Sequence, residues 1–89
     1  MKQLFQTQQF SKDVKRMANR GKDIEKLSSV VRLLAEDRPI DTRHRDHPLS
    51  GAWSQCRDCH IECDWVLIYS TDKAFLRLER IGTHSDLFE

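Results

Sequence analysis

Residues 56–69 constrain the fold of this chain more than any other stretch of its sequence. In the first half, Cys59, Ile61 and Cys63 alternate with polar residues, which is the period-two pattern of a β-strand with one packed face. His60 then points away from the core. The second half, residues 65–69, is apolar at every position and rich in aromatic and β-branched side chains, which predicts a more deeply buried strand.

Two more strands are predicted around this segment. A short turn at residues 70–72 leads into a strand at residues 73–81. Residues 1–6 alternate in the same way, although more weakly, and predict a further strand with Leu4 packed inward. We therefore expect a small, mostly antiparallel sheet that carries polar side chains on one exposed face.

Two amphipathic helices precede these central strands. Thr7 is a possible N-cap of the first helix, and Gly21 ends it in the left-handed conformation. Asp23 can cap the second helix, which stops before Pro39 because the residue before a proline resists helical geometry. The apolar stripes consist of Phe10, Val14 and Met17 in the first helix and of Ile24, Leu27, Val30, Val31 and Leu34 in the second. The sequence predicts an α+β fold in which two antiparallel helices pack on one face of the sheet.

The loop at residues 39–53 has no period, but it is not a linker. Leu49 and Trp53 are large apolar residues that would anchor the loop to the core and so fix His47. The chain has 89 residues, no internal repeat and no low-complexity tract. We expect one domain, residues 1–89.

A short tail follows the last predicted strand. Chain ends fray unless they are tied down, and Leu87 and Phe88 imply that this tail docks back onto the core. Docking would also hold His84 in place.

Charge is unevenly distributed along the chain, although the net charge is only +1. Residues 1–46 hold eleven Lys or Arg against seven Asp or Glu, a balance of +4, and residues 47–89 hold four against seven, a balance of −3. The basic face of the first helix consists of Lys12, Lys15, Arg16 and Arg20. This face is either a nucleic-acid contact or simply a solvated helical surface.

The sequence carries no signal for a membrane. It has no apolar run of roughly 18 residues, and its N-terminus lacks the order of a secretory signal. We therefore expect a cytoplasmic protein.

Three of the four histidines, His47, His60 and His84, lie on or beside the β region, close to Asp64 and Arg80. Two further carboxylates, Asp58 and Glu62, are nearby. Imidazole titrates near neutral pH, and a guanidinium binds phosphate oxygens and stabilises charge that builds there. Such a set suits cleavage of RNA through attack of its own 2′-hydroxyl, which needs no metal and no cofactor.

The three cysteines allow two other hypotheses. Residues 56–60 match the C-x-x-C-H haem-attachment pattern, but no methionine lies downstream to act as an axial ligand. Cys56, Cys59 and Cys63 with a histidine could bind zinc, but Cys56 and Cys59 fall on opposite faces of a continuous strand. We favour Cys59 and Cys63 as small buried apolar residues, and the odd cysteine count fits a reducing compartment.

Five motifs closely resemble the YafQ-like branch of the RelE/ParE toxin superfamily. They are QFSKDVK at residues 9–15, DHPLSGAW at residues 46–53, RD-x-H at residues 57–60 followed by DW, R-x-x-R-x-GTH at residues 77–84, and LF at residues 87–88. The resemblance runs almost from end to end, and the spacings fit without a gap.

The resemblance implies the toxin of a type II toxin–antitoxin pair, which cleaves mRNA in the ribosomal A site and is bound by a cognate antitoxin. It implies two N-terminal helices against a curved, mostly antiparallel sheet. By family analogy His84 is the general acid, Arg80 stabilises charge on the phosphate, and His60 or His47, oriented by Asp64, is the base. Phe88 either stacks on an RNA base or docks into the core.

Two cysteines depart from the residues that are common in the family, so the resemblance does not predict how these positions pack. Cys56 stands where the family commonly has an aromatic residue, and Cys63 where it commonly has a proline. On an ideal strand Arg80 shares a face with the apolar residues Leu76 and Leu78, so a bulge or strand end must turn it toward the site.

The alternative function is a non-enzymatic inhibitor of DNA gyrase of the ParE kind, which shares the fold. A protein that acts by binding alone has no need for the histidines and Asp64 together. Their presence favours the nuclease.

Overall fold

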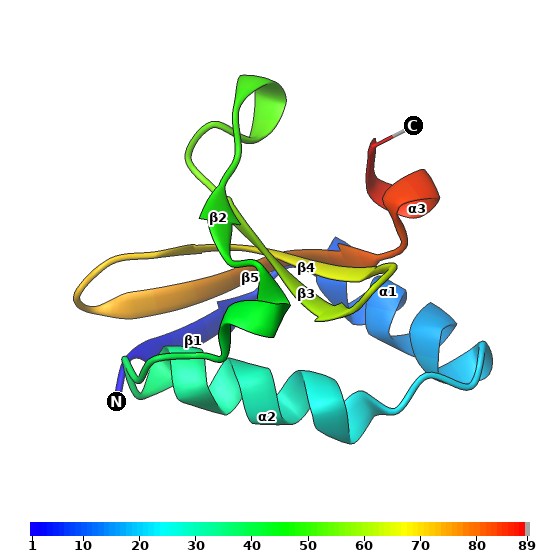
Figure 1. Ribbon diagram of the computed structural model, residues 1–89, viewed down its shortest axis with the longest axis horizontal. Helices are drawn as coiled ribbons and strands as arrows, with labels where there is room; N and C mark the ends of the chain where they lie inside the picture. The colour runs from blue at the N-terminus through cyan, green and yellow to red at the C-terminus, as the bar shows by residue number, and fades with distance from the viewer. Residues whose placement is uncertain (89) are drawn as a thin grey trace.

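Two helices cover one face of a five-stranded sheet, and a loop and a short helix cover the other (Figure 1). The computed structural model describes residues 1–88. The helices are α1 (Gln8–Asn19), α2 (Ile24–Ala35) and α3 (His84–Phe88), and the strands are β1 (Gln3–Gln6), β2 (His47–Pro48), β3 (Arg57–Glu62), β4 (Trp65–Thr71) and β5 (Phe75–Gly82). The loop before β3 contains two 3-10 turns, η1 (Thr42–His44) and η2 (Gly51–Trp53). No helix within residues 1–88 has the length and apolar character that crossing a bilayer requires.

The strands are ordered β1-β5-β4-β3-β2, and every pair is antiparallel except β1 with β5. This confirms the predicted α+β class and the mostly antiparallel sheet. β5 begins at Phe75, slightly later than predicted, because the side chain of Asp72 closes the preceding turn. Its carboxylate accepts hydrogen bonds from the N–H groups of Ala74 at 2.7 Å and Phe75 at 2.9 Å.

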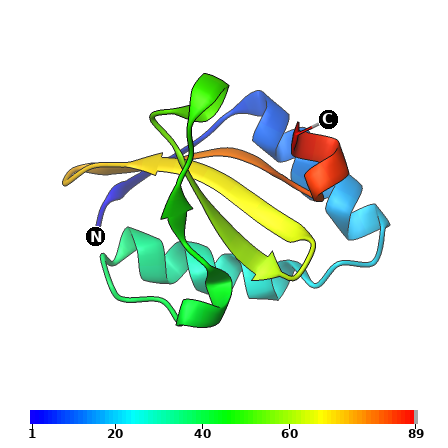
Figure 2. The same cartoon turned by 45° about the horizontal axis from the view of Figure 1, so that its top comes forward.

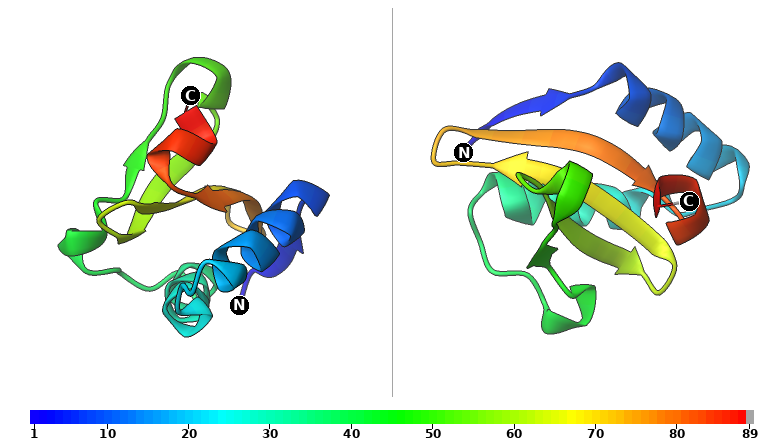
Figure 3. Two further views of the ribbon diagram at one scale, coloured as in Figure 1. Left: turned by 90° about the vertical axis from the view of Figure 1, so that its right-hand side faces the viewer. Right: turned by 90° about the horizontal axis from the view of Figure 1, so that it is seen from above.

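The boundaries of α1 and α2 follow from their predicted caps. The Thr7 hydroxyl accepts a hydrogen bond from the Phe10 N–H at 2.9 Å, and the Asp23 carboxylate accepts one from the Glu25 N–H at 3.0 Å. Gly21 follows α1 with a φ of +87°, which costs glycine no steric strain. From this turn the two helices run in opposite directions and splay apart, α1 along β5 and α2 beneath the sheet (Figure 3).

Both faces of β4 are buried, which explains its unbroken apolar sequence. Trp65, Leu67 and Tyr69 belong to the main core, between the sheet and the helices, while Val66 and Ile68 face the opposite side. The main core also contains Phe10, Met17, Leu27, Val30, Cys59, Leu76, Leu78 and Ile81. The prediction of a deeply buried strand is confirmed.

The second face of β4 is covered by segments that are far apart in sequence. Leu49 and Trp53 from the loop, and Leu87 from α3, pack there. Figure 1 shows α3 and the loop that contains η2 on the same side of the sheet. The predicted anchoring of the loop is confirmed, and the tail docks through Leu87. Phe88 is 42% exposed, so the alternative in which it docks into the core is wrong.

Two residues predicted to face the core are exposed. Leu4 lies on an edge strand and is 49% exposed, because it lines an open groove between β1, α1 and α2 instead of being covered by a helix. Cys63 is exposed in the β3–β4 turn, since the strand register shifts after His60 and ends the alternation. Cys59 packs in the main core and Cys56 packs on the opposite face, so these cysteines do not converge on one haem or zinc site.

Gly82 allows α3 to fold back against the end of β5. A Cβ atom at this position would lie 2.9 Å from Cβ of Asp86 and 3.3 Å from Cδ2 of Leu87. Both distances are shorter than the 3.5–4.0 Å at which carbon atoms pack favourably. The missing side chain therefore sets how closely the short helix approaches the sheet.

The carboxylate of Asp13 closes the edge of β5 that β1 leaves open. Asp13 lies on α1, is fully buried, and accepts hydrogen bonds from the Ile81 N–H at 3.2 Å and from the Arg80 guanidinium at 2.8 and 3.1 Å. Gln9 and Arg16 donate to the same carboxylate, each at 3.0 Å. Burial opposes ionisation of Asp13, but the hydrogen bonds outweigh it and lower the pKa.

We expect Asp13→Asn to lower the free energy of unfolding by about 3–5 kcal/mol at neutral pH, because Arg80 loses its charged partner. The lowered pKa means that Asp13 stabilises the fold above the pKa of its unfolded form, about 4, and that this stabilisation is lost as the pH falls through the folded pKa. Urea unfolding at pH 7 and at pH 3 checks both statements, and the difference between the two proteins should shrink at the lower pH.

Asp37→Asn is the matched control, because the side chain of Asp37 is 86% exposed. It should change the free energy of unfolding by less than about 0.5 kcal/mol. Equal stability of the wild type and Asp13→Asn at pH 7 would show that the buried carboxylate contributes nothing.

Candidate active site

The side chains predicted to carry chemistry lie on the face of the sheet opposite the main core. One row across β2, β3, β4 and β5 consists of His47, Asp58, Ile68 and Arg80, and the next row consists of His60, Val66 and Gly82. Residues directly opposite each other in antiparallel strands share a face. The pairing therefore gathers two histidines, a carboxylate and an arginine on one surface.

A bulge in β5 brings Arg80 to this face. Ile68 is paired with Arg80 and its neighbour Tyr69 with Leu78, so Glu79 has no partner in the register. The extra residue reverses the alternation of side chains beyond Leu78. This is the irregularity that the sequence requires for Arg80, and Asp13 then holds the guanidinium at the edge of the sheet.

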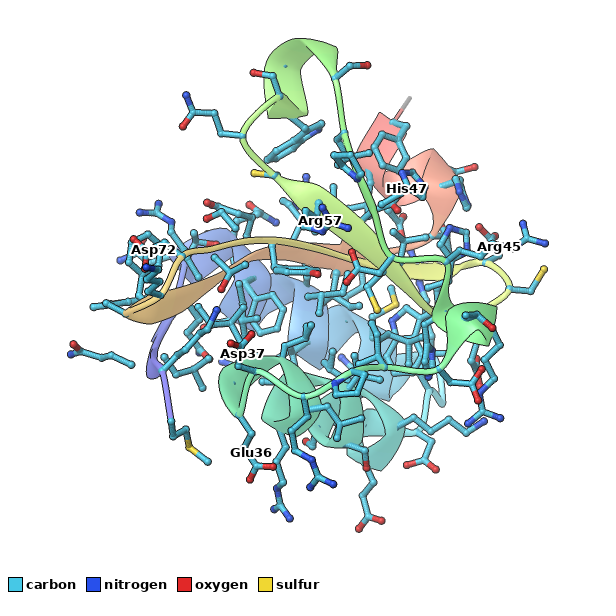
Figure 4. The ribbon with its side chains drawn as sticks, turned by 60° about the vertical axis from the view of Figure 1, so that its left-hand side comes forward. Glu36, Asp37, Arg45, His47, Arg57 and Asp72 are labelled. Atoms are coloured by element: carbon cyan, nitrogen blue, oxygen red, sulfur yellow. The ribbon has the colours of Figure 1, made fainter. Side chains whose placement is uncertain are left out.

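A polar contact on the face of the sheet opposite the site holds β2 against β3. The Asp46 carboxylate accepts hydrogen bonds from Arg57 Nε at 2.8 Å and from the Tyr69 hydroxyl. Because side chains alternate along the chain, His47 then faces the site. Figure 4 labels His47 on β2 and Arg57 on the neighbouring β3, with Arg45 extending away from the sheet.

Asp58 is the carboxylate at the centre of the histidines. It is only 4% exposed, and its Oδ1 lies 2.8 Å from Nε2 of His47. Burial raises the pKa of Asp58, and the neighbouring His47, His60 and His84 partly offset that effect. Nδ1 of His47 lies 3.1 Å from the carbonyl oxygen of Pro48. Both ring nitrogens of His47 therefore lie beside oxygen atoms, which fixes the orientation of the ring.

Asp64 orients His84 rather than another histidine. Its Oδ1 lies 2.7 Å from Nδ1 of His84 and accepts a hydrogen bond from the His84 N–H at 3.0 Å. The backbone and side-chain hydrogen bonds of His84 lower the pKa of Asp64. The expectation that Asp64 orients His60 or His47 is wrong, because α3 folds back over the β3–β4 turn.

The ring of His84 lies near the rings of both His60 and Phe88. The ring centroids of His60 and His84 are 5.4 Å apart, and those of His84 and Phe88 are 5.8 Å apart. The structure thus gathers His47, His60 and His84 around the buried Asp58, and Asp64 and Phe88 lie beside His84. Arg80 lies in the same row of the sheet as Asp58, on the far side of Ile68. Phe88 is exposed at the rim of this set, as a base-stacking residue requires.

The predicted basic face of α1 is only partly free. Arg20 binds the Asp86 carboxylate at 2.8 Å, and Arg16 binds Asp13 at 3.0 Å, so both arginines contribute to the structure of α1 and its neighbours. Figure 2 shows α3 lying against α1 at this point. Lys12 and Lys15 are exposed, and no ion pair of theirs occurs within residues 1–88. Of the four basic residues of this face, the two lysines are those without an ion pair in the described part of the chain.

Sequence reasoning gave Asp58 no role, although a signal for it was present. Asp58 shares its strand parity with His60, and two residues of one parity two positions apart lie on one face. What the sequence could not show is the pairing of Asp58 with His47, which depends on where the loop returns to the sheet. Burial of Asp58 under that loop gives it a central position in the site.

The site also has the spacing of a metal-binding group. One possible ligand atom each from His47, Asp58 and His60 lie within 4.8 Å of one another, and within residues 1–88 no other set of His, Cys, Asp or Glu side chains has such spacing. Imidazole and carboxylate ligands suit zinc or copper. A metal here would occupy two of the three imidazoles. That the chemistry needs no metal stays a prediction.

The arrangement suits proton transfer around a phosphate. Imidazoles on either side of a phosphodiester can take a proton from one oxygen and give a proton to another, while the arginine stabilises the charge between them. Phe88 offers an exposed aromatic ring beside these groups.

Comparison with known proteins agrees with this geometry. The profile of the family described as "Bacterial toxin of type II toxin-antitoxin system, YafQ" matches residues 2–89. The mRNA interferase toxin YafQ of Escherichia coli K12 is 47% identical over 81 residues, which cover 90% of this chain and 88% of that protein. The toxin fold in the crystal structure of the E. coli DinJ–YafQ complex matches over the full length of both chains, with a TM-score of 0.93 at 42% identity.

A metal-bound toxin from Helicobacter pylori is also similar in structure. It matches with a TM-score of 0.92 at 37% identity, over 99% of this chain and 100% of that one. The family profile spans nearly the whole sequence. The two structural matches cover at least 99% of this chain and all of the other chain. This chain belongs to the YafQ family of bacterial toxins of type II toxin–antitoxin systems.

Proposed function

We propose that this toxin is an endoribonuclease that cleaves mRNA in the ribosomal A site by metal-independent acid–base catalysis. The observation that carries the proposal is the cluster of three imidazoles around the buried Asp58, with Arg80 in the same row of the sheet. The naming of the E. coli relative as an mRNA interferase supports it. Action on ribosomes implies a cytoplasmic location.

The contacts favour particular roles for the histidines. His84 is held by Asp64 through Nδ1, which leaves Nε2 to protonate the leaving 5′ oxygen. Both nitrogens of His47 already face acceptors, whereas the His60 ring makes no hydrogen bond within residues 1–88. We therefore assign His60 as the base that takes the 2′-hydroxyl proton. His47 holds Asp58 in place beneath the phosphate.

We assign to Arg80 the stabilisation of the negative charge that builds on the phosphate. Two of its nitrogens, Nε and one terminal nitrogen, bind Asp13, and the other terminal nitrogen remains available. Phe88 would stack on a base beside the scissile bond. A gyrase inhibitor of the ParE kind would need none of these groups, and a carboxylate buried among imidazoles would only reduce its stability.

We expect His84→Ala to reduce the rate of mRNA cleavage on translating ribosomes by about 10²- to 10⁴-fold, because it removes the general acid. Primer extension on mRNA from a translating extract measures the cut. Ser85→Ala is the matched control, since Ser85 is the exposed neighbour on the same short helix. The control should cleave like the wild type. Undiminished cutting by His84→Ala would rule out the assigned acid.

Lys12 and Lys15 are proposed to contact ribosomal RNA from the exposed side of α1. Replacing both with Glu should weaken ribosome binding and reduce the slope of log affinity against log salt, because fewer counterions are released. Lys73→Glu, at an exposed position in the β4–β5 turn, is the control for a change of charge alone. If affinity and salt slope match those of the control, this face is only solvated.

An antitoxin is the proposed protein partner, as in the DinJ–YafQ complex. A groove of about 550 Å³ lies between β1, α1 and α2. It is lined by apolar residues, among them Leu4 and Val14, and carries the basic residues Lys2, Lys15 and Arg32. An amphipathic segment with an apolar face and acidic flanks would complement this groove. We propose that the antitoxin supplies that segment.

Leu4→Asp should weaken antitoxin binding by at least about tenfold, since it places a charge in the apolar groove. Phe5→Asp is the matched control. Its position is equally exposed, at 48% against 49%, but it points to the other face of the same strand. Isothermal titration with the cognate antitoxin distinguishes them. Equal loss of affinity in both variants would place the partner elsewhere.

A further inference from the structure

The outer edge of β3 is covered by a strand only at its beginning. β2 consists of two residues, which pair with Arg57 and Asp58. Beyond Asp58 the edge of β3 is covered by η1. The side chain of His44, the last residue of η1, reaches this edge, and its Nδ1 lies 2.6 Å from the carbonyl oxygen of His60.

The chemistry of this contact fixes the donor. A carbonyl oxygen only accepts, so the proton must be on Nδ1 of His44. The neutral Nδ1–H form and the imidazolium both satisfy this requirement. The hydrogen bond therefore persists whether or not the ring is charged, and it acts as a constant restraint on the backbone.

η1 is itself held in a defined conformation. The Asp41 carboxylate accepts a hydrogen bond from the Arg43 N–H at 2.9 Å, and the Asp41 carbonyl oxygen accepts one from the His44 N–H at 3.0 Å. Arg45 then adopts the left-handed conformation, with φ of +49°, which turns the chain toward β2. This backbone directs the half-buried His44 at β3 rather than leaving it free in solvent.

The contact falls where β3 is least regular. The pairing of β3 with β4 shifts between His60 and Glu62, so the ladder on the inner edge is interrupted beside His60. His60 is the last residue of β3 paired before this shift, with Val66 as its partner, so the bond from His44 adds a restraint on the His60 peptide from the outer edge. The backbone of His60 sets the direction in which its imidazole leaves the strand. The distance of 5.4 Å between the His60 and His84 rings depends on that direction.

We propose that His44 is a positioning residue that aligns His60 for catalysis through its Nδ1–H bond to the His60 carbonyl oxygen. The inference rests on the proposed nuclease function and deepens it. One short segment then controls two members of the site, because His44 restrains His60 and His47 follows three residues later to bind Asp58.

Three substitutions at His44 separate positioning from general packing. An Asn side chain can place its N–H where Nδ1–H is, whereas Gln reaches the position of Nε2 and Leu cannot donate at all. Single-turnover cleavage of mRNA on programmed ribosomes, measured against toxin concentration, gives the rate at saturation and the concentration for half-saturation. We expect His44→Leu and His44→Gln to lower the saturating rate about 10- to 100-fold with unchanged half-saturation. His44→Asn should stay within about threefold of the wild type.

A second measurement needs neither ribosomes nor activity. In the purified toxin, nuclear Overhauser contacts between the His60 and His84 rings should be present in the wild type and in His44→Asn, and weakened in the Leu and Gln variants. If the wild type fails to cleave on ribosomes, the proposed function fails, while this spectrum still tests the role of His44.

The proposal is overturned if all three variants cleave like the wild type. It is also overturned if Asn, Gln and Leu lower the rate and the melting temperature together and equally, since His44 would then be a packing residue only. Ring contacts that are unchanged in His44→Leu would lead to the same conclusion.

Discussion

The buried carboxylate of Asp13 is the interaction on which the rest of the site depends. β1 pairs with only part of β5, and an unpaired strand edge is costly unless another group satisfies it. Asp13 accepts the Ile81 N–H as a neighbouring strand would, and it binds the side chain of Arg80 at the same time. Thr7 completes the edge with a hydroxyl bond to the Glu79 carbonyl oxygen at 2.9 Å. The helix that begins with its cap at Thr7 thus replaces a strand and positions the arginine of the site.

The two faces of the sheet serve different purposes: one forms the stable core, and the other carries the proposed site. The face toward the helices is a continuous apolar core, which supplies most of the stability. The opposite face has a smaller apolar cluster, formed by the loop and α3, beside the polar groups of the site. Packing on this second face holds the loop with His47 and the helix with His84 at fixed distances from β3. The geometry of the proposed site is therefore a product of packing between segments that are remote in sequence.

Local chemistry made much of the fold predictable from the sequence. The caps at Thr7 and Asp23, the strand parity of His60 and the need for a bulge before Arg80 all depend on residues within a few positions of one another. Asp13 could have been found in the same way, because it lies within the apolar stripe of α1, next to Val14. A carboxylate in that place needs a buried partner.

Contacts between distant segments could not be predicted. Asp64 binds His84, and Arg20 binds Asp86, because α3 folds back across the sheet, and no local pattern encodes that path. His44 is similar, since its partner is a backbone carbonyl oxygen, which leaves no signature in side-chain sequence. The exposure of Leu4 was not predicted, because alternation along an edge strand does not show that the two helices leave an open groove over its inner face. In each case the prediction would have required knowledge of how distant segments pack together.

The distribution of the cysteines has a practical consequence. Burial raises the pKa of the Cys59 thiol to about 12 and also raises that of Cys56, so neither forms the reactive thiolate readily. Cys63 is exposed in the β3–β4 turn, next to Asp64. A maleimide dye would therefore attach to the unaltered protein at one place, beside the ring of His84. Its fluorescence would report directly when nucleic acid arrives over the imidazoles.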